Sequence, residues 1–257
     1  MEKTISRRSR RLHIGYGELL SEVEWSSLLA HHPILDGFSP AELGHLRELV
    51  TAFLRAKRFE AAEGIVLAGH MKAVIAVQAC LPILNLGPKW YRNWKTVVVV
   101  PEHFEAKARI LDPAGVVHEW EELRIGESWS RGPVVLSWPD VEASGWADGF
   151  NVVIHEAAHR LDLLDGAMNG RPPLHRKMNP VEWQRVFTAA YLGLERRLGG
   201  GGAAVVSDYA LTSPSEFFAV VSEIFFERPH ALKREYPQVY HLLEEFYRQD
   251  PDRRLAG

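Results

Sequence analysis

The stretch FNVVIHEAAHRLDLLD, residues 150–165, contains the pattern H-E-x-x-H at His155, Glu156 and His159. In a helix, residues four apart lie one turn apart on the same face, so both imidazoles can reach one metal ion. The Glu between them can act as a general base on water, an arrangement typical of zinc peptidases. The pattern therefore predicts a helix with two zinc ligands, His155 and His159, and a general base, Glu156.

A helical projection of this stretch separates an apolar face from a polar one. At about 100° per residue, the side chains on one stripe predict a face that packs on the core. This stripe contains Phe150, Val153, Ile154, Ala157, Ala158, Leu161 and Leu164. His155, His159 and Asp162 fall on another face, and Gly166 follows as a helix stop.

A catalytic zinc site needs three protein ligands, so the pattern leaves one ligand to be found. Asp165 swings away from the histidines if the helix continues, which makes it a weak candidate. Asp162 points down the helix, and it suits a partner that orients His159, or a cap near the helix end, better than a ligand.

Glu216, in the stretch SPSEFF at residues 213–218, is the stronger candidate. A Glu ligand from a second helix is the solution of the gluzincins. The same spacing is also that of a capping box, in which Glu216 would fold back on the backbone N–H of Ser213. The residues alone leave both interpretations open. Glu223 lies on nearly the same helical face, as an orienting group, an alternative ligand or a surface charge.

The first 90 residues are expected to be mainly helical. Helices are predicted at about 18–30, from the Ser39-Pro40 cap to about Lys57, and at about 71–84. The basic cluster at residues 7–11 is interpreted as a solvated N-terminal arm, and no signal-peptide core follows it. Cys80 is the only cysteine, so no internal disulfide can form, and a buried thiol in a reducing cytoplasm is expected.

A small sheet is expected between this helical part and the H-E-x-x-H helix. Strands are predicted at 96–101, at 108–112 and 116–120 around a hairpin turn, and at 133–138. The run Gly199–Gly202 predicts a flexible loop before a C-terminal helical region. The expected fold class is therefore α+β and zincin-like, with residues 1–257 as a single metallopeptidase domain and 91–257 as its catalytic part.

Composition excludes several classes of protein. Apolar residues make up 46% and charged residues 25% of the 257 residues, as in ordinary globular proteins. The net charge of −3 provides no global basic field for nucleic acid. No apolar stretch is long enough to span a bilayer. We expect neither a nucleic acid nor a membrane as a partner.

Taken together, these motifs resemble the Mlc titration factor family of glucose-regulated metallopeptidases. The resemblance covers roughly residues 10–250 and includes the stretches at 53–59, 75–82, 126–138, 155–162 and 213–219. The metal-site fold of that family is similar to the catalytic domain of anthrax lethal factor. The joint occurrence of these stretches in this order is far more specific than H-E-x-x-H by itself.

The resemblance implies roles for individual residues. Glu216 would bind one zinc ion together with His155 and His159, Glu156 would be the general base, and Tyr209 would stabilise the transition state. Without the resemblance, Tyr209 is better explained as a loop aromatic that packs on the helix. The resemblance also implies a partner, the transcriptional repressor Mlc. It leaves endopeptidase and aminopeptidase activity both open.

Two functions follow as alternatives. The first is a zinc peptidase that acts on a peptide or protein, which could pair with a free edge of the strand at 133–138 unless that strand is an ordinary core strand. Trp129, Trp138 and Trp146 could line its specificity pocket or could be core. The second is a regulatory protein that sequesters a repressor and has only incidental peptidase activity.

Overall fold

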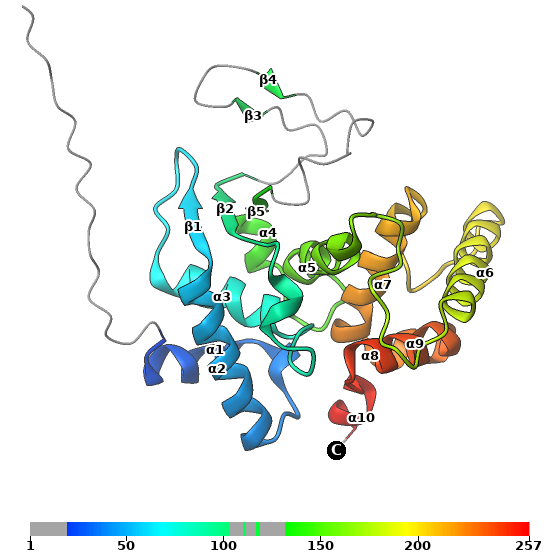
Figure 1. Ribbon diagram of the computed structural model, residues 1–257, viewed down its shortest axis with the longest axis horizontal. Helices are drawn as coiled ribbons and strands as arrows, with labels where there is room; N and C mark the ends of the chain where they lie inside the picture. Colours follow the sequence, from blue (N-terminus) through cyan, green and yellow to red (C-terminus); the bar gives the residue numbers. More distant parts are fainter. Residues whose placement is uncertain (1–19, 103–109, 112–116, 119–131, 257) are drawn as a thin grey trace, which may run out of the picture.

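The structure is a computed structural model that describes residues 20–102, 110–111, 117–118 and 132–256 (Figure 1). Its N-terminal part consists of α1 (Glu22–His31), η1 (Pro33–Leu35), α2 (Pro40–Ala56), β1 (Arg58–Ala61), α3 (Gly69–Cys80) and η2 (Pro88–Tyr91). The middle holds β2 (Thr96–Val100), β3 (Ile110–Leu111), β4 (Val117–His118), β5 (Val134–Ser137) and α4 (Trp138–Glu142). The basic cluster at 7–11 lies outside the described residues.

The remaining elements form the C-terminal part. They are α5 (Val152–Asp162), η4 (Leu163–Asp165), α6 (Pro180–Gly199), η5 (Asp208–Leu211), α7 (Pro214–Glu227), α8 (Pro229–Glu235), α9 (Pro237–Tyr247) and α10 (Pro251–Leu255). Helix α6 was not predicted from the sequence. The break predicted at the Gly run is confirmed, because Gly199 is the last residue of α6 and Gly201 has a φ of 76°.

Local signals explain where the N-terminal helices begin and end. The predicted start of α2 is confirmed, since Ser39 caps it reciprocally with Glu42 and Pro40 is its first residue. The predicted start of the first helix near Glu18 lies outside the described residues; within them, Ser21 caps a helix that begins at Glu22. Helix α3 ends at Cys80 rather than at Leu84, because Pro82 has no backbone N–H to continue the helical hydrogen bonds.

A three-stranded parallel sheet has the order β1-β2-β5, with β5 at one edge. Strand β2 confirms the prediction at 96–101, and it buries Val97 and Val99. The two hairpin strands are confirmed as the separate antiparallel pair β3 and β4, while the turn at 113–115 lies outside the described residues. Strand β1 was not predicted, because R-F-E-A has neither β-branched residues nor clear alternation.

Helix α5 carries the H-E-x-x-H motif and lies beside α7 near the middle of the molecule (Figure 1). Asn151 caps its first turn. Gly166, with a φ of 94°, ends the helical segment formed by α5 and η4, as predicted. Six of the seven residues on the predicted apolar stripe are buried. Phe150 is the exception, since it precedes the helix and is 43% exposed.

Helix α7 is the most deeply buried helix near the motif. Its aromatic side chains pack against α6 and α9, for example Phe218 in a tilted contact with Trp183 and in an edge contact with Phe246. The buried apolar side chains of the described residues form one core that includes residues from α2, α3, β2, α5 and α7. This core fixes α7 against α5, because both helices bury their apolar faces in it.

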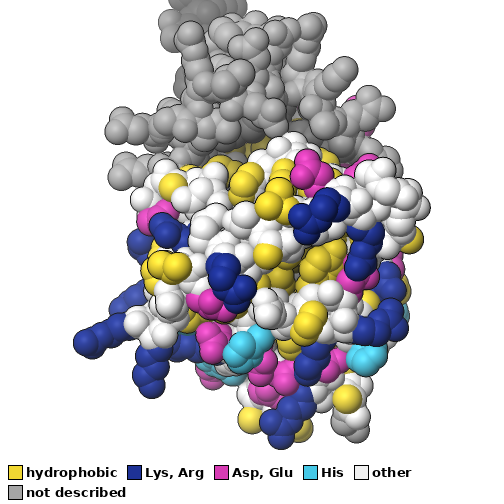
Figure 2. Space-filling view, turned by 90° about the vertical axis from the view of Figure 1, so that its right-hand side faces the viewer, with side chains coloured by type: hydrophobic (Ala, Val, Ile, Leu, Met, Phe, Trp, Pro, Cys, Tyr) yellow, Lys and Arg dark blue, Asp and Glu magenta, His cyan; other side chains and the backbone are white. Residues whose placement is uncertain are grey.

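The surface and the single cysteine agree with the composition. Cys80 is fully buried, as expected for a structural thiol, and burial raises the pKa of its thiol well above the ordinary range. On the face shown in Figure 2, Lys and Arg side chains intermingle with Asp and Glu. Among the described residues, no helix is both long and apolar enough to cross a membrane.

Candidate metal centre

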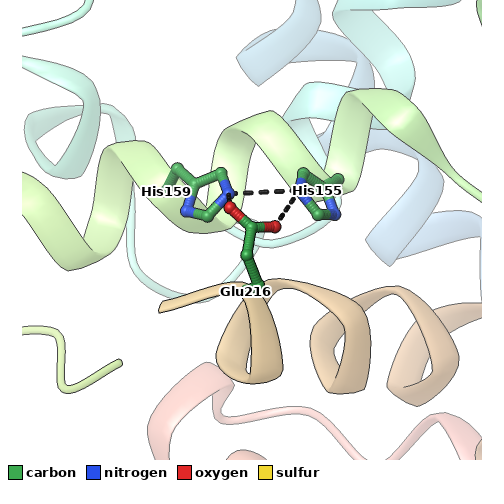
Figure 3. Close-up of side chains that lie close together, drawn as sticks. All are labelled: His155, His159 and Glu216. Carbon is green, nitrogen blue, oxygen red and sulfur yellow. Dashed lines mark hydrogen bonds and ion pairs between the residues drawn. The ribbon is translucent and has the colours of Figure 1, made fainter. Parts of the chain in front are cut away.

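Helices α5 and α7 bring three potential ligands to one point (Figure 3). His155 and His159 project from one face of α5, and Glu216 projects from the first turn of α7 between them. The Nε2 atoms of the two histidines are 3.1 Å apart. Glu216 Oε2 lies 3.0 Å from His155 Nε2, and Oε1 lies 3.2 Å from His159 Nε2.

The other nitrogen of each ring is held by a residue of α7. His155 Nδ1 lies 2.7 Å from Glu223 Oε1, and His159 Nδ1 lies 3.0 Å from Ser215 Oγ. An ionised carboxylate only accepts hydrogen bonds, so His155 carries a proton on Nδ1. In a neutral ring this leaves the lone pair on Nε2, the nitrogen that faces the other two ligands.

The three donors have the chemistry and spacing of a transition-metal site. Ligand atoms about 2.0–2.2 Å from a tetrahedral ion lie about 3.3 Å from one another, close to the separations of 3.0–3.2 Å seen here. When His155 is neutral and carries its proton on Nδ1, the buried Glu216 Oε2 receives no hydrogen bond, although His155 Nε2 lies 3.0 Å away. A buried carboxylate oxygen in this position is costly unless a cation compensates it. The residues therefore suit a divalent metal ion.

The electrostatics of the site without metal point the same way. Burial by itself lowers the pKa of His155, but hydrogen bonds to Glu216 and Glu223 outweigh it and raise the pKa to about 10. Burial raises the pKa of Glu216, but hydrogen bonds from His155 and His159 lower it far below its ordinary value. Without metal, a proton on His155 thus compensates the charge of Glu216, and a metal ion would have to displace that proton.

The geometry distinguishes the candidates for a third ligand. Ser213 Oγ accepts the backbone N–H of Glu216 at 3.1 Å, so the cap of α7 is formed, yet the Glu216 carboxylate faces the histidines. Asp165 is exposed in η4 and accepts the N–H of Ala167. Asp162 is fully buried and accepts a hydrogen bond from Ser215 rather than joining the cluster.

Two further candidate residues lie beside the three ligands. Glu156 is half-buried on α5 between the two histidines in sequence. Tyr209, on η5, is 50% exposed, and its ring centroid lies 6.0 Å from that of His155. The structure thus brings Tyr209 next to the cluster, although it lies far from the motif in sequence.

The proposed substrate strand is tied to the metal helix. Arg160 of α5 donates a hydrogen bond to the carbonyl of Pro133, directly before β5, at 2.9 Å.

Among the tryptophans suggested for a pocket, Trp138 packs against the core, and Trp146 is half-exposed and stacks on His32. Trp129 lies outside the described residues.

The sequence alone does not decide the roles of the two residues that hold the second nitrogens of the histidines. Nothing in the stretch SPSEFF assigns a function to Ser215, and the helical face of Glu223 is compatible with three roles: an orienting group, an alternative ligand or a surface charge. The spacing of Glu216 and Glu223, seven residues on one helix, was the available signal for Glu223. No comparable signal marked Ser215.

The donor set and the H-E-x-x-H helix are those of the metallopeptidase class. The chain belongs to the glucose-regulated metallo-peptidase M90 family, whose model matches residues 5–248. An uncharacterized protein of Synechocystis sp. is 38% identical over 88% of this chain and 84% of its own length. Mlc titration factor A of Klebsiella pneumoniae is 36% identical over 91% of this chain and 89% of its own. The resemblance predicted from the sequence is thereby confirmed.

Proposed function

We propose that this protein is a zinc-dependent peptidase whose metal is held by His155, His159 and Glu216. The observation that carries the proposal is the convergence of two Nε2 atoms and a buried carboxylate from separate helices. Two nitrogens and one carboxylate match the donor preference of catalytic zinc, which keeps its fourth position for water or substrate. Bound zinc would supply a Lewis acid and would lower the pKa of a water molecule.

The residues of the chain would carry the proton transfers. Glu156 would accept a proton from the attacking water and would return it to the leaving amine as a general acid. The hydroxyl of Tyr209 would donate a hydrogen bond to the oxygen of the former carbonyl, where negative charge develops. Its position beside His155 and its partial exposure support this role, because the donor must reach a substrate.

An extended peptide is the substrate class that we propose. Strand β5 is at the edge of the sheet formed by the described residues, and Arg160 ties its start to the metal helix. A peptide that pairs with a sheet edge gains backbone hydrogen bonds that do not depend on its sequence. Its scissile bond would then lie close to α5.

Glu156→Gln tests the general-base role. Removal of a positioned base should lower peptide hydrolysis by about 10²- to 10⁴-fold, and zinc content should stay at that of the parent chain. The measurement is turnover of a peptide library together with metal analysis of the same samples. Retained turnover in the variant would contradict the assignment of Glu156.

Glu216→Ala tests the third ligand. The variant should lose stoichiometric zinc, because two histidines remain where a catalytic site needs three protein ligands. Ser213→Ala is the matched control, since it removes the cap of α7 at a cost of about 1 kcal/mol and leaves the Glu216 carboxylate in place. Full zinc retention in Glu216→Ala would restore the capping interpretation.

A second function is suggested by the relatives. Proteins named Mlc titration factor A are similar to this chain along most of its length, so we propose capture of an Mlc-type repressor as the alternative. Sequestration requires no general base. Binding of the repressor by Glu156→Gln would show that capture and hydrolysis are separate, and loss of binding would argue that they are one activity.

A further inference from the structure

We infer that Glu223 and the pair Ser215–Asp162 are positioning residues that set the orientation of the two histidine ligands. The inference rests on the proposed metal site and deepens it. Each imidazole has one nitrogen directed at Glu216 and the other held by a side chain of α7. A single helix would therefore provide one ligand and hold the other two in their productive orientation.

Glu223 connects His155 to the start of its own helix. Its Oε1 lies 2.7 Å from His155 Nδ1, and its Oε2 accepts the backbone N–H of Asn151 at 2.7 Å. Asn151 is the N-cap of α5. Both carboxylate oxygens are engaged and the residue is only 6% exposed. Glu223 is thus held from two sides, and the ring of His155 has little freedom to rotate.

Ser215 connects His159 to a buried acid. Its Oγ lies 3.0 Å from Asp162 Oδ2 and 3.0 Å from His159 Nδ1. A hydroxyl has one proton, and when that proton goes to the carboxylate, the oxygen can only accept the N–H of the ring. Asp162 Oδ2 also accepts the backbone N–H of Gly170 at 2.8 Å, which fixes the acid in place.

The positions of these groups on α7 follow from helix geometry. Glu216 and Glu223 are seven residues apart, so they lie on nearly the same face, two turns from one another. Ser215 adjoins Glu216 and faces the later of the two histidines. Partners of this kind raise ligand basicity and fix the ring, and their loss usually weakens metal binding by about 10- to 100-fold.

Helix α7 also provides matched controls. Ser222 is a fully buried serine whose hydroxyl donates to the carbonyl of Phe218, away from the histidines. Glu227 is a buried glutamate one turn beyond Glu223 that contacts Asn151 and Ala147. Ser222→Ala therefore removes a buried hydroxyl, and Glu227→Gln replaces a buried carboxylate by an amide, on the same helix but at residues that do not contact a candidate ligand.

The experiment measures zinc affinity by competition with a chromophoric chelator in the full chain. Glu223→Gln and Ser215→Ala should weaken zinc by about 10- to 100-fold, while Ser222→Ala and Glu227→Gln remain at the parent value. Ser215→Thr retains the hydroxyl and should restore the affinity. The visible spectrum of the cobalt-loaded chain should change in Glu223→Gln and Ser215→Ala only, because it reports ligand geometry.

Thermal unfolding of each variant in chelator separates loss of fold from loss of metal. Parent-like zinc affinity and cobalt spectra in folded Glu223→Gln and Ser215→Ala would overturn the inference and leave the proposed metal site standing. Equal weakening by the two control variants would also overturn it, because burial on α7 alone would then explain the effect. Failure of the parent chain to bind zinc would overturn the metal site itself.

Discussion

Glu227 shows how a single buried acid couples the fold to pH. Its Oε1 accepts the side-chain N–H of Asn151 and its Oε2 accepts the backbone N–H of Ala147, each at 2.7 Å. Burial raises the pKa of Glu227 from 4.5 to about 7 in spite of these hydrogen bonds. Glu227 is only 2% exposed. Its charge is therefore costly in the folded state.

This shift predicts that stability falls as pH rises from 5 to 8. The folded chain binds the Glu227 proton more tightly than the unfolded chain, so this stabilisation is complete below about 4.5 and is lost as pH passes about 7. The loss between pH 5 and 8 should be about 2 kcal/mol. Urea unfolding of the parent and of Glu227→Gln in chelator measures it, and parallel pH curves would contradict the assignment.

At the scale of elements, the loop after α5 meets the start of α7 at one glycine. Gly170 has a φ of 77°, and a Cβ there would lie 2.3 Å from the carbonyl oxygen of Pro214. Its N–H also holds Asp162. Close backbone approach at Gly170 thus limits the separation of the two helices that carry the three candidate ligands.

Gly170→Ala should therefore damage both stability and the metal centre. Gly166→Ala is the control, because Gly166 also has a positive φ but has no atom within 4 Å of an added Cβ. The control should lose about 1 kcal/mol from backbone strain, whereas Gly170→Ala should lose about 1–3 kcal/mol more from the clash and should bind zinc more weakly. Equal unfolding free energies and equal zinc affinities of the two variants would contradict this view.

At the scale of the whole molecule, a metal bound by α5 and α7 would link segments distant in the chain. A ligand that binds only the folded state stabilises it, by about 2.7 kcal/mol at a hundred times its Kd. For a chain of this size we expect Tm to rise by about 5–10 °C. Thermal unfolding with zinc and with chelator measures the rise, and His155→Ala should show none. Identical Tm values for the parent in both conditions would argue against a structural contribution of the metal.

Local patterns predicted the features that depend on residues close in sequence. The phase of H-E-x-x-H places His155 and His159 on one face of α5, and both project toward Glu216. The cap at Ser39 and the stop at Gly166 follow from side-chain and backbone preferences of single residues. The prediction that Phe150 lies on the buried face was wrong, because periodicity does not say where a helix begins. The N-cap of α5 is Asn151, so Phe150 precedes the helix.

Features that depend on distant residues could not be predicted in this way. Glu216 has the same spacing from Ser213 in a capping box and in a ligand site, and only the packing of α7 against α5 directs its carboxylate to the histidines. Ser215 and Asp162 are 53 residues apart, so no local pattern could pair them.

The amino-acid sequence by itself therefore determined the metal motif, its helix and the family, because these reside in the order and spacing of neighbouring residues. Only the tertiary structure decided which acid faces the histidines and which groups hold their second nitrogens. The physical reason is that these choices depend on how two helices bury their apolar faces in one core. The relative position of α5 and α7 is a property of that core rather than of either helix alone.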